Sequence, residues 1–335
     1  MDVSTKLKER FCKDCNIPLR LYQEPYFMDR LKLYDKFYGT MDKWNIFTSE
    51  LAKYHCGQDY LEEYNHVKDQ AIEYIKSSWA YKMFNAEDMN NFKVTHEGLP
   101  AKDIFKSTND GKTFISIDMK KVNFSALKYY GETIGYSMFG YTGTVHMWED
   151  FLCKFTSNDH ILNSKYIRQV ILGNCNPRKQ VAYEKWIMDQ VLSSLENNFM
   201  MGLLELVVFF SNDEIVFDVT LLKENNSMDF AGSILDAIRY FIKNTFSVPF
   251  RVELFTIHKI DGTDGYYKEI YTYSAHDGFA KEKKYEFKCL DNYMLPFVLR
   301  KFQCEEITEN DKVFYHEGLL SKFIEVPEIE VNLDE

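Results

Sequence analysis

The chain has 335 residues, with 51 acidic and 40 basic side chains and a formal net charge of −11. Affinity for nucleic acid comes mostly from neutralising phosphates. This charge therefore counts against tight, indiscriminate binding of duplex, although segregated charge still permits a local basic groove.

No run of about 18 apolar residues occurs, so no membrane span is expected. The charged N-terminal segment lacks a signal-peptide core, and seven cysteines without secretory features indicate reduced thiols in a cytoplasmic protein.

The first region, residues 1–110, is expected to be mostly helical. Within 59–84, apolar and aromatic residues such as Leu61, Tyr64 and Val67 recur at a spacing of about 3.6 residues. The polar, glycine-containing segment 107–111 is typical of a turn. We therefore place a boundary there.

The second region, residues 111–260, carries the pattern that indicates a fold. In chain order we expect a strand at 113–117, a fingers-like helical insertion at about 132–200 with its longest helix at 178–195, strands at 203–210 and 215–221, a helix at 230–243 and a strand at 250–258. This β-α-β-β-α-β order is the connectivity of a ferredoxin-like unit, whose helices cover one face of an antiparallel sheet. The predicted fold class is therefore α+β, with a ferredoxin-like βαββαβ core.

The third region, residues 261–335, is expected to be a small thumb-like or accessory β/α extension. A hairpin at 266–273, a strand at 285–288 and a short helix at 293–302 are predicted, before an acidic tail.

Two acidic residues, far apart in the chain, are expected to meet in this fold. Asp118 follows the first strand, and Asp213 lies in the turn between the second and third strands. Paired carboxylates suit two Mg²⁺ (or Mn²⁺) ions, of which one activates a hydroxyl and the other holds a triphosphate. Acidic residues at strand ends also serve turn chemistry alone, which is the structural alternative. We predict Asp118 and Asp213 as metal ligands, and Glu214 as a third carboxylate that reaches the metals if it lies in the turn with Asp213.

The two acidic segments resemble the metal motifs of palm-domain polymerases and nucleotidyltransferases. Segment 114–119, with 123–127 after it, looks like the first motif, and 211–220 is similar to the second. The Ser-x-Asp-Glu order resembles that of Y-family translesion polymerases and the turn of tRNA-His guanylyltransferases, and more loosely that of diguanylate cyclases.

This resemblance implies roles for individual residues. Asp118 and Asp213 match the metal ligands of the palm family, Glu214 its catalytic acidic neighbour, and Met119 a backbone carbonyl that contacts metal and nucleotide. Lys120 stands where Y-family enzymes have a second aspartate.

A basic cluster lies between the two motifs and contains Lys165, Arg168, Arg178 and Lys179. In a palm enzyme such an insertion forms fingers, whose cations bind triphosphate oxygens, and arginine does so bidentately. Solvated charges on a helix face are the alternative for this cluster. A second basic group, at 281–284, lies either along a nucleic-acid backbone or in a solvated loop.

A zinc site is the weaker metal hypothesis. Cys12 and Cys15, with His55 and Cys56, offer four soft ligands for Zn²⁺. The second pair is adjacent in sequence rather than spaced as in zinc knuckles.

The leading functional hypothesis is a Mg²⁺-dependent nucleotidyltransferase that joins a nucleoside triphosphate to a hydroxyl end of DNA or RNA. One alternative is a nucleotide cyclase or oligonucleotide signal synthase, which fits the acidic charge because no polymer is bound. The other is a non-catalytic, palm-derived binding or assembly protein, which the aromatic-rich N-terminal region and Lys120 favour.

Overall fold

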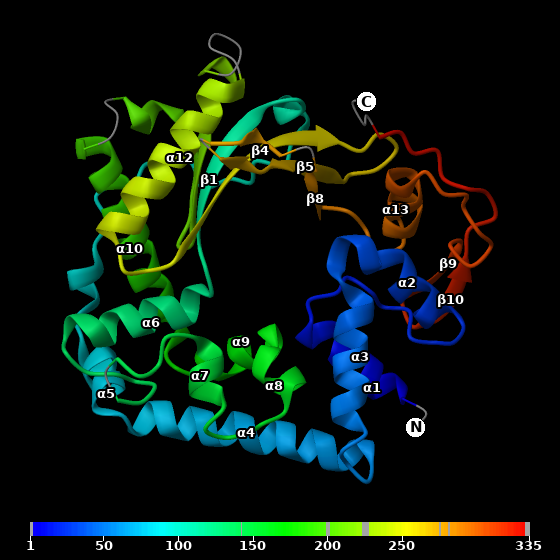
Figure 1. Ribbon diagram of the computed structural model, residues 1–335, viewed down its shortest axis with the longest axis horizontal. Helices are drawn as coiled ribbons and strands as arrows, with labels where there is room; N and C mark the ends of the chain where they lie inside the picture. Colours follow the sequence, from blue (N-terminus) through cyan, green and yellow to red (C-terminus); the bar gives the residue numbers. More distant parts are fainter. Residues whose placement is uncertain are drawn as a thin grey trace.

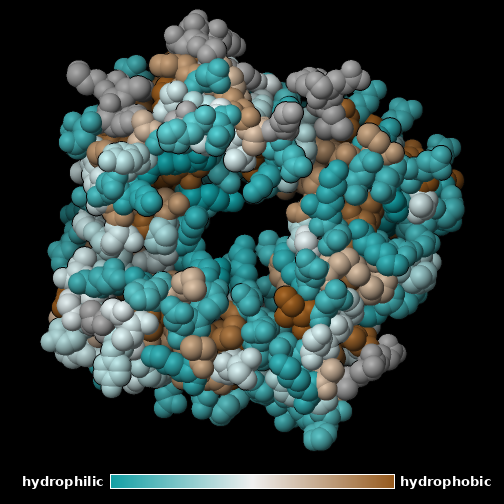
Figure 2. All heavy atoms as spheres, viewed as in Figure 1, coloured by the Kyte–Doolittle hydropathy of each residue, from teal (hydrophilic) through white to brown (hydrophobic). Residues whose placement is uncertain are grey.

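The computed structural model describes residues 3–141, 143–198, 202–222, 228–274, 276–280 and 282–331. The fold is mixed α+β, and the chain surrounds a central opening with one large sheet on one side and helices around the rest (Figure 1). Figure 2 shows the molecule hollowed at this opening, with mainly hydrophilic residues around it.

The N-terminal region is helical. Its elements are α1 (Thr5–Asp14), α2 (Tyr26–Tyr38), α3 (Thr40–Leu51), α4 (Gly57–Ser77), α5 (Trp79–Ala86) and the 3₁₀ helices η1 (Met89–Phe92) and η2 (Ser107–Asn109). The pattern over 59–84 corresponds to two helices, α4 and α5. Ser78 has extended backbone, and its hydroxyl accepts a hydrogen bond from the Tyr81 N–H, which caps the second helix.

The main sheet is antiparallel, with the strand order β2-β3-β1-β4-β5-β8. Its strands are β1 (Thr113–Met119), β2 (Val207–Phe210), β3 (Glu214–Asp218), β4 (Phe250–Lys259), β5 (Tyr266–Tyr271) and β8 (Lys284–Lys288). The expected strand at 203–210 begins only at Val207, after the 3₁₀ helix η3 (Leu203–Leu206). The expected hairpin at 266–273 is not formed, because β5 pairs with β4 and β8 and so extends the sheet across the boundary placed at residue 260.

The two faces of the sheet differ in chemistry. Ile115, Ile117 and Met119 of β1 point into the main core, which they share with α6 (Val122–Thr133), α10 (Pro177–Asn198) and α12 (Met228–Thr245). Phe114 points to the other face, into a small second cluster that includes Phe255. Since side chains alternate along a strand, Asp118 lies on the same face as Phe114.

The insertion and the C-terminal region complete the ring. Between α6 and α10 lie α7 (Trp148–Leu152), α8 (Asp159–Asn163) and α9 (Lys165–Gly173), which pack near α3 and α4 on the side of the opening away from the sheet (Figure 1). The C-terminal elements are β6 (Tyr273–Ser274), β7 (Gly278–Phe279), α13 (Leu295–Gln303), β9 (Val313–His316) and β10 (Leu319–Lys322). A buried ion pair of 2.6 Å between Arg30 and Asp311 ties this region to α2.

Candidate functional site

The acidic residues predicted from sequence gather at one end of the sheet. Asp118 on β1 is the cross-strand partner of Glu214 on β3. The Met119 N–H donates a 2.8 Å hydrogen bond to the Asp213 carbonyl, so the β2–β3 turn lies against the end of β1. All three carboxylate-bearing residues are partly buried. The expected meeting of the two acidic segments is therefore present in the backbone pairing.

The turn that carries Asp213 is held by its own serine. The Ser211 hydroxyl donates to Asp213 Oδ1 at 2.8 Å and accepts the Glu214 N–H at 3.0 Å. The Ser211 N–H donates to the Glu214 carbonyl at 2.9 Å. These bonds orient the Asp213 side chain before any ligand arrives.

Asp118 has a protein partner that sequence reasoning missed. Nε and Nη2 of Arg251, on β4, both lie 3.1 Å from Oδ2 of Asp118. The side chains of Asp118 and Arg251 are 25% and 41% exposed, so the pair is reachable from solvent. Arg251 is also 3.3 Å from Glu286 and 3.6 Å from Glu253, so three carboxylates share its charge.

Negative charge accumulates at this end of the sheet. Burial raises the pKa of Asp118, and the charges of Asp213 and Glu253 raise it further, against the lowering effect of Arg251. Burial also raises the pKa of Glu214, with the charges of Asp118 and Asp213 adding to the effect and Lys268 opposing it. Carboxylates that destabilise one another's ionised form favour a bound cation.

The donor set fits a hard divalent cation that also contacts its substrate. Within the described ranges, no group of three or more His, Cys, Asp or Glu side chains is arranged to hold a metal ion. Mg²⁺ typically uses one or two carboxylates together with substrate phosphates and water. Asp118 and Asp213 match that requirement better than they match an all-protein metal cage.

Two of the proposed zinc ligands, Cys12 and Cys15, lie in surroundings that disfavour a metal ion. Cys12 is buried in the main core, and burial raises the pKa of its thiol. Burial likewise raises the pKa of Cys15 to about 12. Zinc binds the thiolate, so these surroundings disfavour a metal site at this pair.

Of the basic residues predicted from sequence, Lys165 lies near Asp118, and Arg168 lies near Lys165. Burial lowers the pKa of Lys165 on α9, the nearby charges of Arg168, Lys288 and Arg251 lower it further, and Asp118 opposes them. Lys165 is therefore within electrostatic reach of the sheet's acidic end, although α9 belongs to the helical side of the opening (Figure 1). Burial also lowers the pKa of Arg168, which Glu149 opposes.

The other two basic residues have different surroundings. Lys179 is buried at the start of α10, and its ammonium group donates to the carbonyls of Asn85 at 2.7 Å and Glu87 at 2.5 Å. Arg178 beside it is exposed. Lys179 thus fastens α10 to the end of α5, and the structure does not bring this pair to the acidic end of the sheet. Of the second basic group, Lys281 lies outside the described residues.

A fully buried carboxylate on α10, Glu184, was also not predicted from the sequence. Glu184 accepts hydrogen bonds from Nδ2 of Asn212 at 2.7 Å and of Asn123 at 3.1 Å. Burial raises its pKa to about 7, and the charge of Asp213 contributes to the rise. The available signal was a charged residue within the buried stripe of an amphipathic helix, next to Tyr183 and before Ile187.

Comparison with models of known protein families gives no match, and no curated protein matches the chain. No helix among the described residues is long and apolar enough to cross a bilayer.

Proposed function

We propose that the protein is a Mg²⁺-dependent nucleotidyltransferase that adds a nucleoside triphosphate to a hydroxyl end of nucleic acid. The observation that carries the proposal is the pairing of Asp118 with Glu214, with Asp213 beside them in the adjoining turn. The antiparallel order β2-β3-β1-β4, with α6 after β1 and α12 after β3, is also the order expected of a ferredoxin-like palm.

Each group has a defined task in this proposal. Asp118 and Asp213 would hold the divalent cations, which when bound would acidify the attacking hydroxyl and neutralise phosphate charge. Lys165 and Arg168 bind the triphosphate from the opposite side of the opening. The hydroxyl oxygen forms a bond to the α-phosphorus, the bond from that phosphorus to the pyrophosphate oxygen breaks, and the hydroxyl proton passes to solvent.

Arg251 is compatible with this arrangement. Both of its contacts with Asp118 are made to Oδ2, which leaves Oδ1 for a cation. Its guanidinium group is shared with Glu253 and Glu286, so it has other partners when Asp118 turns to a ligand.

The same arginine favours a second candidate function, a non-catalytic binding protein. In such a protein Arg251 takes the place of a metal ion and neutralises Asp118 permanently. The two candidates differ in whether Mg²⁺ or Mn²⁺ binds at Asp118, which calorimetry measures directly.

The deciding experiment is incorporation of labelled nucleotide with Mg²⁺ or Mn²⁺, on single-stranded and duplex DNA and RNA ends. We expect Asp213→Asn to abolish incorporation while its thermal unfolding stays that of the wild type. Asp218→Asn is the matched control, since Asp218 lies at the other end of the same strand β3 and the variant should retain activity. Incorporation that survives Asp213→Asn would refute the proposal. A cyclic or short oligomeric product from triphosphates alone, seen by mass spectrometry, would identify the cyclase alternative instead.

A further inference from the structure

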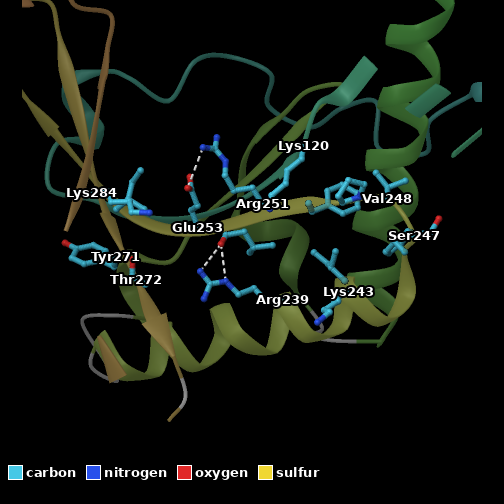
Figure 3. A pocket seen from close by; sticks show the side chains of 16 residues that line it. Lys120, Arg239, Lys243, Ser247, Val248, Arg251, Glu253, Tyr271, Thr272 and Lys284 are labelled. Atoms are coloured by element: carbon cyan, nitrogen blue, oxygen red, sulfur yellow. Dashed lines mark hydrogen bonds and ion pairs between the residues drawn. The ribbon is translucent and has the colours of Figure 1, made fainter. Parts of the chain in front are cut away.

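A groove of about 690 Å³ lies beside the first part of β4, where, among the described residues, β4 has β1 on one side and no strand on the other. β5 pairs with β4 only from Leu254 onward, so the stretch 250–253 pairs with β1 alone. The groove lies between this free strand edge and the C-terminal half of α12 (Figure 3). It begins beside the candidate active site, because Arg251 lines the groove and binds Asp118.

The groove is basic although the protein is acidic. Its charged lining residues are five cations, Lys120, Arg239, Lys243, Arg251 and Lys284, and one carboxylate, Glu253. The three lysines come from three separate segments, and none has an ion pair within the described part of the chain. Unpaired cations from distant segments that converge on one groove indicate an anionic ligand.

The distribution of charge favours an extended anion. Lys284 and Tyr271 lie at one end of the groove, and Lys243 and Ser247 lie at the other (Figure 3). Aromatic rings of Phe246 and Phe250 also line it. A track of cations with aromatic rings is typical of proteins that bind single-stranded nucleic acid, because the cations follow the phosphates and the rings stack on bases.

An acidic peptide is a poorer occupant. An extended peptide would add as a strand to the free edge of β4, which requires unpaired backbone groups. The Val252 carbonyl on that edge already accepts two hydrogen bonds from Arg239, at 3.2 Å from Nε and 3.0 Å from Nη2. Arg239 therefore occupies the slot a peptide strand would need, and its Nη1 forms an ion pair of 3.0 Å with Asp236, so the cations left for a ligand are chiefly the three lysines.

We propose that this groove binds the phosphate backbone of a single-stranded nucleic acid and leads its end toward Asp118. The direction toward Asp118 rests on the proposed nucleotidyl transfer, whereas the binding itself does not. The proposed function assigns the triphosphate to Lys165 and Arg168 on α9, so the groove serves a second substrate, distinct from the triphosphate.

The test is fluorescence anisotropy with short fluorescein-labelled oligo-dT and oligo-U, in EDTA so that no turnover occurs. We expect Lys243→Glu/Lys284→Glu to weaken binding about tenfold or more at low salt. We also expect the slope of log K against log salt to fall by about 0.7 for each lost phosphate contact. The control is Lys32→Glu/Lys36→Glu, two exposed lysines on α2, which changes the net charge equally and should bind as the wild type does.

Several outcomes would overturn the proposal. Equal affinities for the groove variant and the control variant would show that the groove does not contact the strand. Displacement of the oligonucleotide by an oligoglutamate peptide at similar concentration would assign the groove to an acidic protein segment. Circular dichroism of both variants establishes that they are folded.

The same measurements separate this proposal from the proposed function. Oligonucleotide binding that depends on Lys243 and Lys284, without any nucleotide incorporation, would support the groove and remove the transferase. Incorporation that is unchanged in the groove variant, with unchanged oligonucleotide affinity, would support the transferase and remove the groove.

Discussion

Glu184 and Asn212 join the longest helix of the insertion to the turn that carries Asp213. Oε2 of Glu184 accepts a 2.7 Å hydrogen bond from Nδ2 of Asn212, and Oε1 accepts a second bond from Asn123 at the start of α6. One buried carboxyl thus fixes the β2–β3 turn relative to two helices. A change in the protonation of Glu184 therefore changes its hydrogen bond to Asn212, the residue next to Asp213.

Glu184 is expected to make stability depend on pH. Its pKa is about 7 in the folded protein, above its ordinary value of 4.5, so the folded state binds more protons between these two values. The free energy of unfolding should therefore fall as pH rises through this window, by up to about 1.4 kcal/mol per pH unit. Glu184→Gln should flatten this dependence in urea denaturation at about pH 5 and pH 8. The exposed Glu97→Gln serves as control and should keep the wild-type slope.

Asp213→Asn is expected to lower three other pKa values together. The charge of Asp213 raises the pKa of Asp118, Glu184 and Glu214, so its removal should shift each of them downward. Carboxyl carbon chemical shifts, titrated by NMR, report each group separately. Asp218→Asn should leave them unchanged, and unshifted titrations in Asp213→Asn would contradict the electrostatic coupling described above.

Arg251→Gln is expected to strengthen divalent cation binding. The arginine lowers the pKa of Asp118 and competes for its Oδ2, so its loss should raise that pKa and leave the acidic end of the sheet more negative. Titration calorimetry with Mg²⁺ or Mn²⁺ should show an affinity several-fold higher than that of the wild type. The exposed Arg178→Gln is the control. Weaker cation binding in Arg251→Gln would mean that the arginine organises the site rather than competing with the cation.

Lys179→Met is expected to lower stability without changing the KM for nucleotide. The substitution removes the donor that the Asn85 and Glu87 carbonyls share, at an expected loss of about 1–3 kcal/mol. Arg178→Met, on the exposed neighbour, should stay within about 0.5 kcal/mol of the wild type. Thermal unfolding and a KM measurement check both statements. A raised KM with unchanged stability would return Lys179 to the nucleotide site predicted from sequence.

Local pattern was sufficient for much of the secondary structure. Helix α12 and strand β4 begin and end within two residues of their expected bounds, because apolar periodicity and flanking turn residues are local properties. The β-α-β-β-α-β sequence of elements predicted that Asp118 lies beside the turn that contains Asp213, and β1 does pair with β3, which follows that turn. The split at Ser78 and the late start of β2 were missed, since capping and 3₁₀ geometry give weak signals.

What the amino-acid sequence determined by itself was which acidic residues end which strands, and therefore that the strand ending near Asp118 lies beside the turn that contains Asp213. Tertiary structure alone decided the partners of those residues. Arg251 reaches Asp118 only through the register of β4 against β1, and Glu184 reaches Asn212 only because α10 packs against the β2–β3 turn. Lys179 belongs to the same predicted basic cluster as Lys165, but its ammonium group donates hydrogen bonds to backbone carbonyls near α5 and does not lie near the carboxylates. The physical reason is that periodicity and turn chemistry act over a few residues, whereas the partner of a charge depends on packing between segments far apart in the chain.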